Sequence, residues 1–160
     1  MTAQTTHGAA EAEVTGALLA LSRVLVAMAA SSLADLDEEV TLPQFRMLVL
    51  LVSRGPQRVG DLALELSVTS STATRMCNRL VGKGLVAREE RATDRRAAWI
   101  TLTPAGRELV SAAMDRRRDA IAALVKDTPL IRPYALTALV NAVVESAGEL
   151  TDAEWRLAIG

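Results

Sequence analysis

The segment between residues 69 and 84 limits the possible fold of this chain more than any other. At 100° per residue it places four apolar side chains on one narrow helical face, namely Ala73, Met76, Cys77 and Leu80. The opposite face has no acidic and no large apolar residue; it consists of Ser71, Thr74, Arg75, Asn78 and Arg79, with Thr72 at its edge. Gly84 is the residue type that ends helices in the left-handed conformation. The segment is therefore predicted to be a helix that is buried on one side and exposes hydrogen-bond donors and guanidinium groups on the other.

Two helices are predicted before this segment. Thr41 can cap the first, Gln44 stands three residues later as in a capping box, and Pro43 is tolerated in a first turn. Apolar residues then recur at helical spacing up to a break at residues 55–56; they are Phe45, Leu48, Val49 and Val52. A short helix follows with Val59, Leu62, Ala63 and Leu66 inward, and residues 67–70 form a polar turn.

A basic β-hairpin is predicted after the segment. Residues 85–88 indicate a short strand, and residues 98–103 alternate, with Ala98, Ile100 and Leu102 on one side. The polar turn between them, residues 91–96, contains three arginines. Two short helices joined by a polar turn and followed by a basic hairpin predict a winged helix-turn-helix, a mainly α fold with a small β-hairpin wing.

The charge distribution supports this interpretation more than the net charge does. The whole chain of 160 residues carries a formal charge of −1. Residues 67–107 contain eight basic and three acidic residues, a local charge of +5, which leaves −6 for the remainder. A basic block on an acidic chain is the pattern expected of a surface that binds phosphate.

Long helices are predicted at both ends of the chain. Residues 11–33 carry Val14, Leu18, Leu21, Leu25 and Met28 at helical spacing. Thr103 and Pro104 begin another helix that runs to about Lys126. A last helix follows Pro133 and carries Leu136, Leu139, Val140, Val143 and Ala147. Residues 151–154 can cap one more turn before Trp155. These apolar stripes need a covering partner. We expect residues 1–10 to form a flexible tail, and residues 11–160 to form one domain with a DNA-binding lobe at 41–103 and dimerisation helices at 11–34 and 104–160.

A helix of this kind fits the major groove of DNA, where base edges are distinguishable and only the outer face needs polar groups. Arginines at a hairpin tip can reach the neighbouring minor groove or the backbone. The alternative is that Arg75, Asn78 and Arg79 are only the solvated face of a core helix. The turn, the wing and the acid-free face together favour contact with DNA, although most such contacts go to phosphate rather than to bases.

The chain resembles the MarR (multiple antibiotic resistance) regulators. The matching motifs, in order, are residues 42–45 (LPQF), 59–63 (VGDLA), 71–75 (STATR), 80–86 (LVGKGLV), 94–96 (DRR) and 102–106 (LTPAG). The resemblance covers residues 11–148 and is specific because the motifs occur together at the right separations.

The resemblance implies an obligate homodimer in which the first helix and the last two of each chain interlock. It also implies that the helix after Thr69 reads the major groove of double-stranded DNA, that Asp94 shapes the wing, and that Arg95 contacts DNA with Arg96 next to it. Small phenolic or other aromatic acids often bind such proteins between the dimerisation helices and the DNA-binding lobe, and usually relieve repression. The predicted DNA-binding residues are Ser70, Ser71, Thr72, Thr74, Arg75, Asn78, Arg79, Arg95 and Arg96.

No catalytic, cofactor or metal site is predicted. Ser71 has no histidine to activate it, and His7, the single histidine, has no partner in the sequence. Cys77 lies on the apolar face, where thiols are generally inert, so a structural role is expected rather than redox sensing. A single cysteine excludes an internal disulfide, and no uninterrupted apolar run reaches the ~18 residues that cross a bilayer. The first residues do not resemble a signal peptide. A cytoplasmic protein without a membrane partner is therefore expected.

Two roles stay open at this point. Trp99 either pads the wing or lies near DNA, and residues 116–118, three arginines between two aspartates, form either a salt-bridged exposed face or part of the dimer seam. With aromatic residues at 2%, single-stranded nucleic acid has almost nothing to stack on. The prediction is a ligand-responsive repressor that acts as a homodimer on a pseudo-palindromic operator. The alternative is a helical dimeric module that binds a small molecule or protein without binding DNA. Target genes, effector and the direction of control are not encoded in these patterns.

Overall fold

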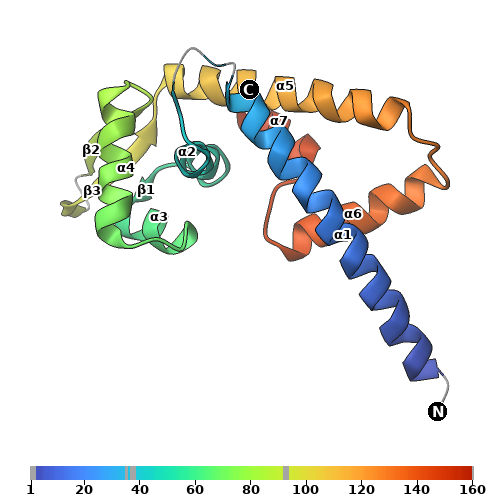
Figure 1. Cartoon of the computed structure of the whole chain (residues 1–160). Helices are drawn as coiled ribbons and strands as arrows, with labels where there is room; N and C mark the ends of the chain where they lie inside the picture. The colour runs from blue at the N-terminus through green and yellow to red at the C-terminus, as the bar shows by residue number, and fades with distance from the viewer. Residues whose placement is uncertain (1–2, 35, 37–38, 92–93, 160) are drawn as a thin grey trace.

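The computed structural model describes the backbone of residues 3–34, 36, 39–91 and 94–159, and the side chains of residues 8–34, 36, 39–89 and 98–159. Its elements are α1 (Ala3–Ala34), α2 (Leu42–Arg54), β1 (Gln57–Arg58), α3 (Val59–Glu65), α4 (Ser70–Gly82), β2 (Val86–Arg91), β3 (Asp94–Leu102), α5 (Pro104–Lys126), α6 (Pro133–Ser146) and α7 (Asp152–Ile159) (Figure 1). The predicted fold class is confirmed: the chain is mainly helical and carries a small antiparallel sheet.

The lobe predicted to bind DNA contains α2, α3, α4 and the sheet. The sheet has three strands in the order β1-β3-β2, and both pairings are antiparallel. Sequence analysis missed β1, because two residues are too short to show the alternation of a strand. Gly84 adopts the predicted left-handed conformation, with φ of 71°, between α4 and β2. The helix-turn-helix and the hairpin therefore lie side by side at one end of the molecule (Figure 1).

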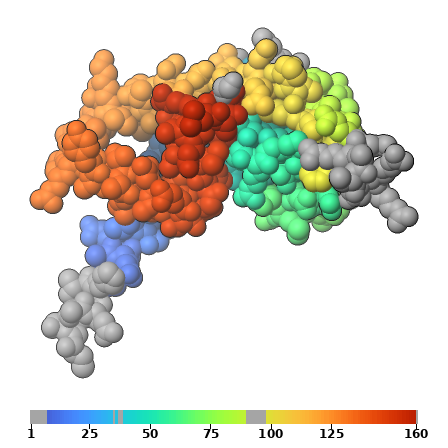
Figure 2. All heavy atoms as spheres, turned by 180° about the vertical axis from the view of Figure 1, so that it is seen from behind, coloured from blue at the N-terminus to red at the C-terminus, as the bar shows by residue number. Residues whose placement is uncertain are grey.

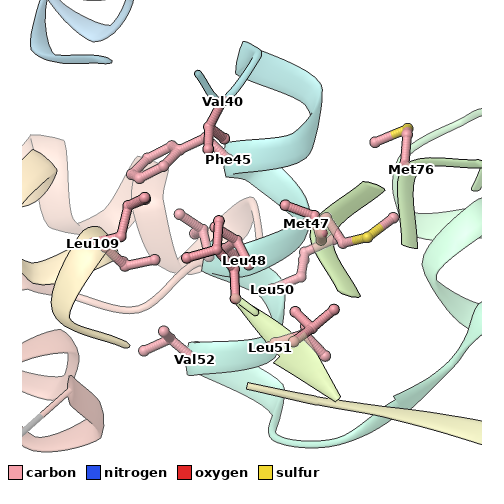
Figure 3. Close-up of a cluster of buried hydrophobic side chains, with 14 of the residues drawn as sticks. Val40, Phe45, Met47, Leu48, Leu50, Leu51, Val52, Met76 and Leu109 are labelled. Carbon is pink, nitrogen blue, oxygen red and sulfur yellow. The ribbon is translucent and has the colours of Figure 1, made fainter. Parts of the chain in front are cut away.

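Helix α2 is the centre of the core. The predicted stripe of Phe45, Leu48, Val49 and Val52 is buried, but so are Met47, Leu50 and Leu51 on its other side. In Figure 3, Phe45 and Leu48 lie toward Leu109 of α5, whereas Met47 lies toward Met76 of α4. The helix is buried around its middle because α5 and α7 pack on one side of it and β3 on another. At its start, the backbone N–H of Thr41 donates to Gln44 Oε1 at 3.0 Å, as the capping box predicts.

The first turn of helix α5 is hydrogen-bonded to the lobe and packs closely on it. Thr103 caps it by accepting a hydrogen bond from the Gly106 N–H at 3.1 Å, and the same hydroxyl donates to the Gly84 carbonyl at 2.7 Å. Gly106 lies so close to the backbone of Leu85 that a Cβ atom there would be 2.1 Å from the Leu85 carbonyl oxygen. Only glycine fits this approach, which connects the wing directly to a helix that runs away from the lobe.

Helix α1 begins at Ala3, whereas the sequence predicted a start near Glu11. The first residues include alanine and glutamine, which favour helix, and no proline interrupts them. The helix stays largely exposed, and α6 has no buried residue at all. In Figure 2, α6 lies on the surface and the N-terminal part of α1 projects from the body.

The exposure of α1 raises the question of what covers it. Within residues 8–34, an 18-residue window has a mean hydropathy of 1.8 and is 11% buried, so by length and composition alone this helix could cross a membrane. The sequence analysis excluded a span by counting uninterrupted apolar runs, which Arg23 breaks; averaged hydropathy tolerates one such break.

Candidate nucleic-acid interface

Helix α4 exposes the polar face that its sequence predicts. Thr69 caps it by accepting a hydrogen bond from the Thr72 N–H at 3.3 Å. The four predicted apolar residues, Ala73, Met76, Cys77 and Leu80, are buried. Among the predicted site residues, Ser70, Ser71, Arg75, Asn78 and Arg79 are exposed, and Thr72 and Thr74 are partly buried. The helix therefore has one face in the core and one face free to meet a ligand.

Local hydrogen bonds order the start of this face. Thr69 Oγ1 lies 3.0 Å from Ser71 Oγ and donates to Thr72 Oγ1 at 2.9 Å. Arg75 Nη2 donates to the same Thr72 oxygen at 3.3 Å, which holds the guanidinium against the first turn of the helix. The Thr74 hydroxyl donates to the Ser70 carbonyl at 2.8 Å, so its proton is already used within the helix. Ser70, Ser71 and Arg75 are the exposed predicted site residues at the start of the helix.

A second arginine joins the face from the sheet. Arg88 Nη2, on β2, donates to Asn78 Oδ1 at 2.6 Å. The sequence assigned Arg88 only to a strand and not to the site. The spacing of residues along one element cannot show a contact between α4 and β2, although the strand alternation that places Arg88 on the face of Val86 is a usable signal.

Arg79 has a different neighbourhood from Arg75. It lines a cavity of about 770 Å³ together with Lys83 and residues at the start of α2 and the end of α1, including Leu33, Val40 and Gln44. Gln44 is 3% exposed there. Contact of Arg79 with DNA stays a prediction.

The wing is only partly described. The backbones of Asp94, Arg95 and Arg96 belong to β3, which pairs with β2 and shows a register shift between Glu90 and Arg91. The side chains of residues 90–97 lie outside the described residues, as does the structure of residues 92–93. The roles predicted for Asp94, Arg95 and Arg96 therefore stay predictions.

Trp99 pads the outer face of the sheet. Its ring lies under the Arg58 guanidinium, 5.2 Å from the ring centroid, and Arg58 is its cross-strand partner on β1. The ring is partly buried on the side of β3 opposite to Ile100, which is fully buried. The ring therefore packs on the sheet through Arg58, and proximity of Trp99 to DNA stays a prediction.

Cys77 belongs to the core. It is fully buried, and its Sγ lies 3.6 Å from the Met47 sulfur. Burial raises the pKa of the Cys77 thiol, against a smaller opposing effect of the positive charge of Arg88. Burial and a raised pKa both disfavour the reactive thiolate.

A second cavity of about 520 Å³ lies where α2, α5 and the C-terminal segment meet. Its walls include Phe45, Met114, Arg117, Leu150 and Trp155. The Arg117 guanidinium lies over the Phe45 ring at 5.5 Å, and its Nε atom is buried without a hydrogen-bond partner in the described part of the chain. Burial lowers the pKa of Arg117. The cavity thus combines aromatic walls with a partly desolvated cation.

The three consecutive arginines of α5, residues 116–118, have different surroundings. Arg116 is exposed, and Arg118 pairs with Asp115 at 2.7 Å and with Asp152 at 3.2 Å, as a salt-bridged face requires. Arg117 departs from that expectation because it turns inward over Phe45. Within the described ranges, no group of three or more histidine, cysteine, aspartate or glutamate residues is arranged to hold a metal ion.

The fold and the exposed face of α4 define a winged helix-turn-helix protein. A sequence model of the MarR family matches residues 40–98. The crystal structure of Rv1404 from Mycobacterium tuberculosis is 40% identical, with a TM-score of 0.80 over 87% of this chain and 95% of that one. Apo MarR from Escherichia coli is 26% identical, with a TM-score of 0.66 over 81% of this chain and 96% of that one.

A curated relative is the HTH-type transcriptional regulator YfiV of Bacillus subtilis, 30% identical over 80 residues, which are 48% of this chain and 50% of that protein. The chain spans about half the length of the curated relatives it matches. The chain belongs to the MarR family.

Proposed function

We propose that this protein is a sequence-specific regulator of transcription that binds double-stranded DNA as a homodimer, in the cytoplasm, and acts as a repressor. The observation that carries the proposal is the exposed face of α4, which presents Ser71, Arg75 and Asn78 without any acidic residue. A helix of this shape fits the major groove, and donors and guanidinium groups match the acceptors of guanine and adenine edges. Arg95 and Arg96 are proposed to contact the adjacent minor groove or backbone, and Asp94 to shape the wing.

The exposed helices at both ends support the homodimer. The stripe of α1 and the side chains of α6 together leave many large apolar residues at the surface, among them Leu18, Leu21, Leu25, Leu139 and Val143. An apolar surface of this extent on a soluble chain marks an interaction site. A two-fold symmetric pair of lobes predicts a pseudo-palindromic operator with half-sites about 10 base pairs apart, or a multiple of that.

A salt series on duplex DNA tests the proposal. Fluorescence anisotropy with labelled random duplexes should show binding at low salt that falls steeply as salt rises, because cations on the protein release counterions from phosphate. Arg75→Ala and Arg95→Ala should each weaken binding about tenfold or more to an operator selected from genomic fragments. The matched control is Arg54→Ala, because Arg54 is exposed and paired with Glu65 at the end of α2. Absence of binding by the wild type at low salt would overturn DNA binding.

Response to a small organic acid is part of the proposal and is supported by the Arg117 cavity. Aromatic walls and a buried Nε atom that has no hydrogen-bond partner among the described residues match an aromatic carboxylate. Salicylate is a suitable probe, and the fluorescence of Trp155 in the cavity wall provides the signal once Trp99→Phe removes the other tryptophan. Quenching of Trp155 should saturate with salicylate in the Trp99→Phe protein and be lost when Arg117→Met is added. Salicylate binding without any binding of duplex DNA would instead favour a dimeric ligand-binding module.

A further inference from the structure

Arg88 lies on the face of β2 that is turned toward α4. It pairs with Ile100 in the register of β2 and β3, and Ile100 is fully buried. Strand alternation therefore places Arg88 on the inner face of the hairpin with Val86, the face that packs against α4. Its positive charge also acts on Cys77 of α4. Arg88 is exposed, and its guanidinium meets the exposed face of α4 at Asn78.

The guanidinium fixes the orientation of one amide on that face. Arg88 Nη2 and Asn78 Oδ1 are 2.6 Å apart, a short charge-assisted hydrogen bond. Rotating the amide by 180° would bring its NH2 group against another donor, so this contact decides which end of the amide faces Arg88. The oxygen is held, and the NH2 group of Asn78 is left to donate elsewhere.

We propose that Arg88 is a positioning residue that sets the base preference of Asn78; the proposal rests on DNA binding by α4. An asparagine whose amide rotates freely can present either its oxygen or its NH2 group to the groove, where adenine N6 donates and purine N7 accepts. With its oxygen engaged by Arg88, Asn78 presents a donor to the groove. Asn78 then donates to an acceptor in the groove, and the N7 atom that adenine and guanine share is such an acceptor.

Base analogues in the operator test this directly. Replacing purines of a half-site one at a time with their 7-deaza forms removes N7 and keeps Watson–Crick pairing. In the wild type, one position should lose about tenfold in affinity, in the range expected for a lost base contact. Asn78→Ala should become insensitive to the analogue at that position. Arg88→Met should become less sensitive than the wild type, because its Asn78 amide is no longer held, and the double variant should be as insensitive as Asn78→Ala. Methionine keeps most of the aliphatic stem of Arg88.

Two further variants separate positioning from simple attraction. Arg88→Lys keeps a charged donor and should recover part of the sensitivity to the analogue, whereas Arg54→Ala should keep all of it. If Arg88→Met weakens operator and random duplexes equally and still discriminates the analogue as strongly as the wild type does, Arg88 is only a phosphate contact and the inference is wrong. If the wild type itself binds no duplex at low salt, the failure belongs to the proposed function. Melting curves for each variant confirm that the lobe is folded.

Discussion

At the scale of single residues, Cys77 and Gly106 show how tightly the lobe is packed around α4. Cys77 is the one cysteine of the sequence and sits in the core beside Met47, where its thiol has a raised pKa because of burial. In the folded state this thiol keeps its proton at a pH where the unfolded chain, with a thiol pKa of about 8.5, has lost it. The unfolded state then binds fewer protons, so the free energy of unfolding should fall as the pH rises above about 8.5.

The Cys77→Ala variant isolates this contribution. Between pH 7 and pH 10, the wild type should lose more stability in urea titrations than the variant, by up to about 1.4 kcal/mol per pH unit. The native thiol should also react with a disulfide reagent at pH 8 at least about tenfold more slowly than in denaturant. Equal pH dependence in the two proteins would show that the thiol is not kept protonated by the fold.

Alanine substitutions at Gly106 of α5 and Gly82 of α4 should change stability in opposite directions. A Cβ at Gly106 would meet Leu85 backbone atoms at 2.1 and 3.0 Å and Leu102 Cδ1 at 2.9 Å, so Gly106→Ala should destabilise the protein by about 1–3 kcal/mol or more. Gly82 ends α4 and has no atom within 4 Å of such a Cβ. Gly82→Ala should change stability by no more than about 1 kcal/mol, in the stabilising direction, since alanine favours helix. The measurement is the melting temperature of both variants. A lower melting temperature for Gly82→Ala than for Gly106→Ala would show that the close approach of Gly106 to Leu85 is wrong.

At the scale of elements, α7 connects the C-terminal segment to the lobe. Its start is capped by Thr151, whose N–H donates to Glu154 at 2.8 Å, as the sequence predicts. Trp155 is 7% exposed and packs on the core, Arg46 of α2 pairs with Glu149, and Arg107 of α5 donates to the Ala158 carbonyl at 3.0 Å. These contacts hold α7 against two helices that belong to different regions of the sequence.

Two substitutions on α7 test this role. Trp155→Ala should lower the free energy of unfolding by about 3–5 kcal/mol, because it removes a large side chain from a packed site. Leu157 lies on the same helix and is 84% exposed, so Leu157→Ala should change stability by no more than about 0.5 kcal/mol. The measurement is chemical denaturation followed by circular dichroism, which does not depend on the tryptophan signal. Similar values for the two variants would mean that α7 is not packed as described.

The sequence predicted those features that depend on neighbours along one element. The two faces of α4, the cap of α2 at Thr41 and the start of α5 at Pro104 all follow from local spacing and capping chemistry. The features it missed depend on contacts between elements: β1 exists only through its pairing with β3, and Arg88 meets Asn78 only when β2 packs on α4. Likewise, a run of three arginines cannot show that Arg117 turns over Phe45.

At the scale of the whole molecule, the two ends of the chain and the lobe have opposite surface character. The lobe buries most of its apolar residues, whereas α1 and α6 expose most of theirs. Such a division is stable in water if a second copy covers the exposed helices. The same copy would place two α4 helices on one DNA duplex, so dimerisation and operator recognition are expected to fail together.

Leu139→Glu tests this coupling. Leu139 is 50% exposed on α6, and an unpaired carboxylate buried in an interface costs several kcal/mol. The dissociation constant of the dimer should therefore rise by at least about 100-fold. Sedimentation should show the wild type at twice the 17.0 kDa of one chain and the variant at one chain mass, with much weaker operator binding. The matched control is Leu64→Glu on α3: Leu64 is 80% exposed, so this variant should stay dimeric. A Leu139→Glu variant that remains a dimer would place the interface elsewhere. Wild-type protein that is monomeric in water and partitions into lipid vesicles would show that a bilayer, not a second copy, covers α1.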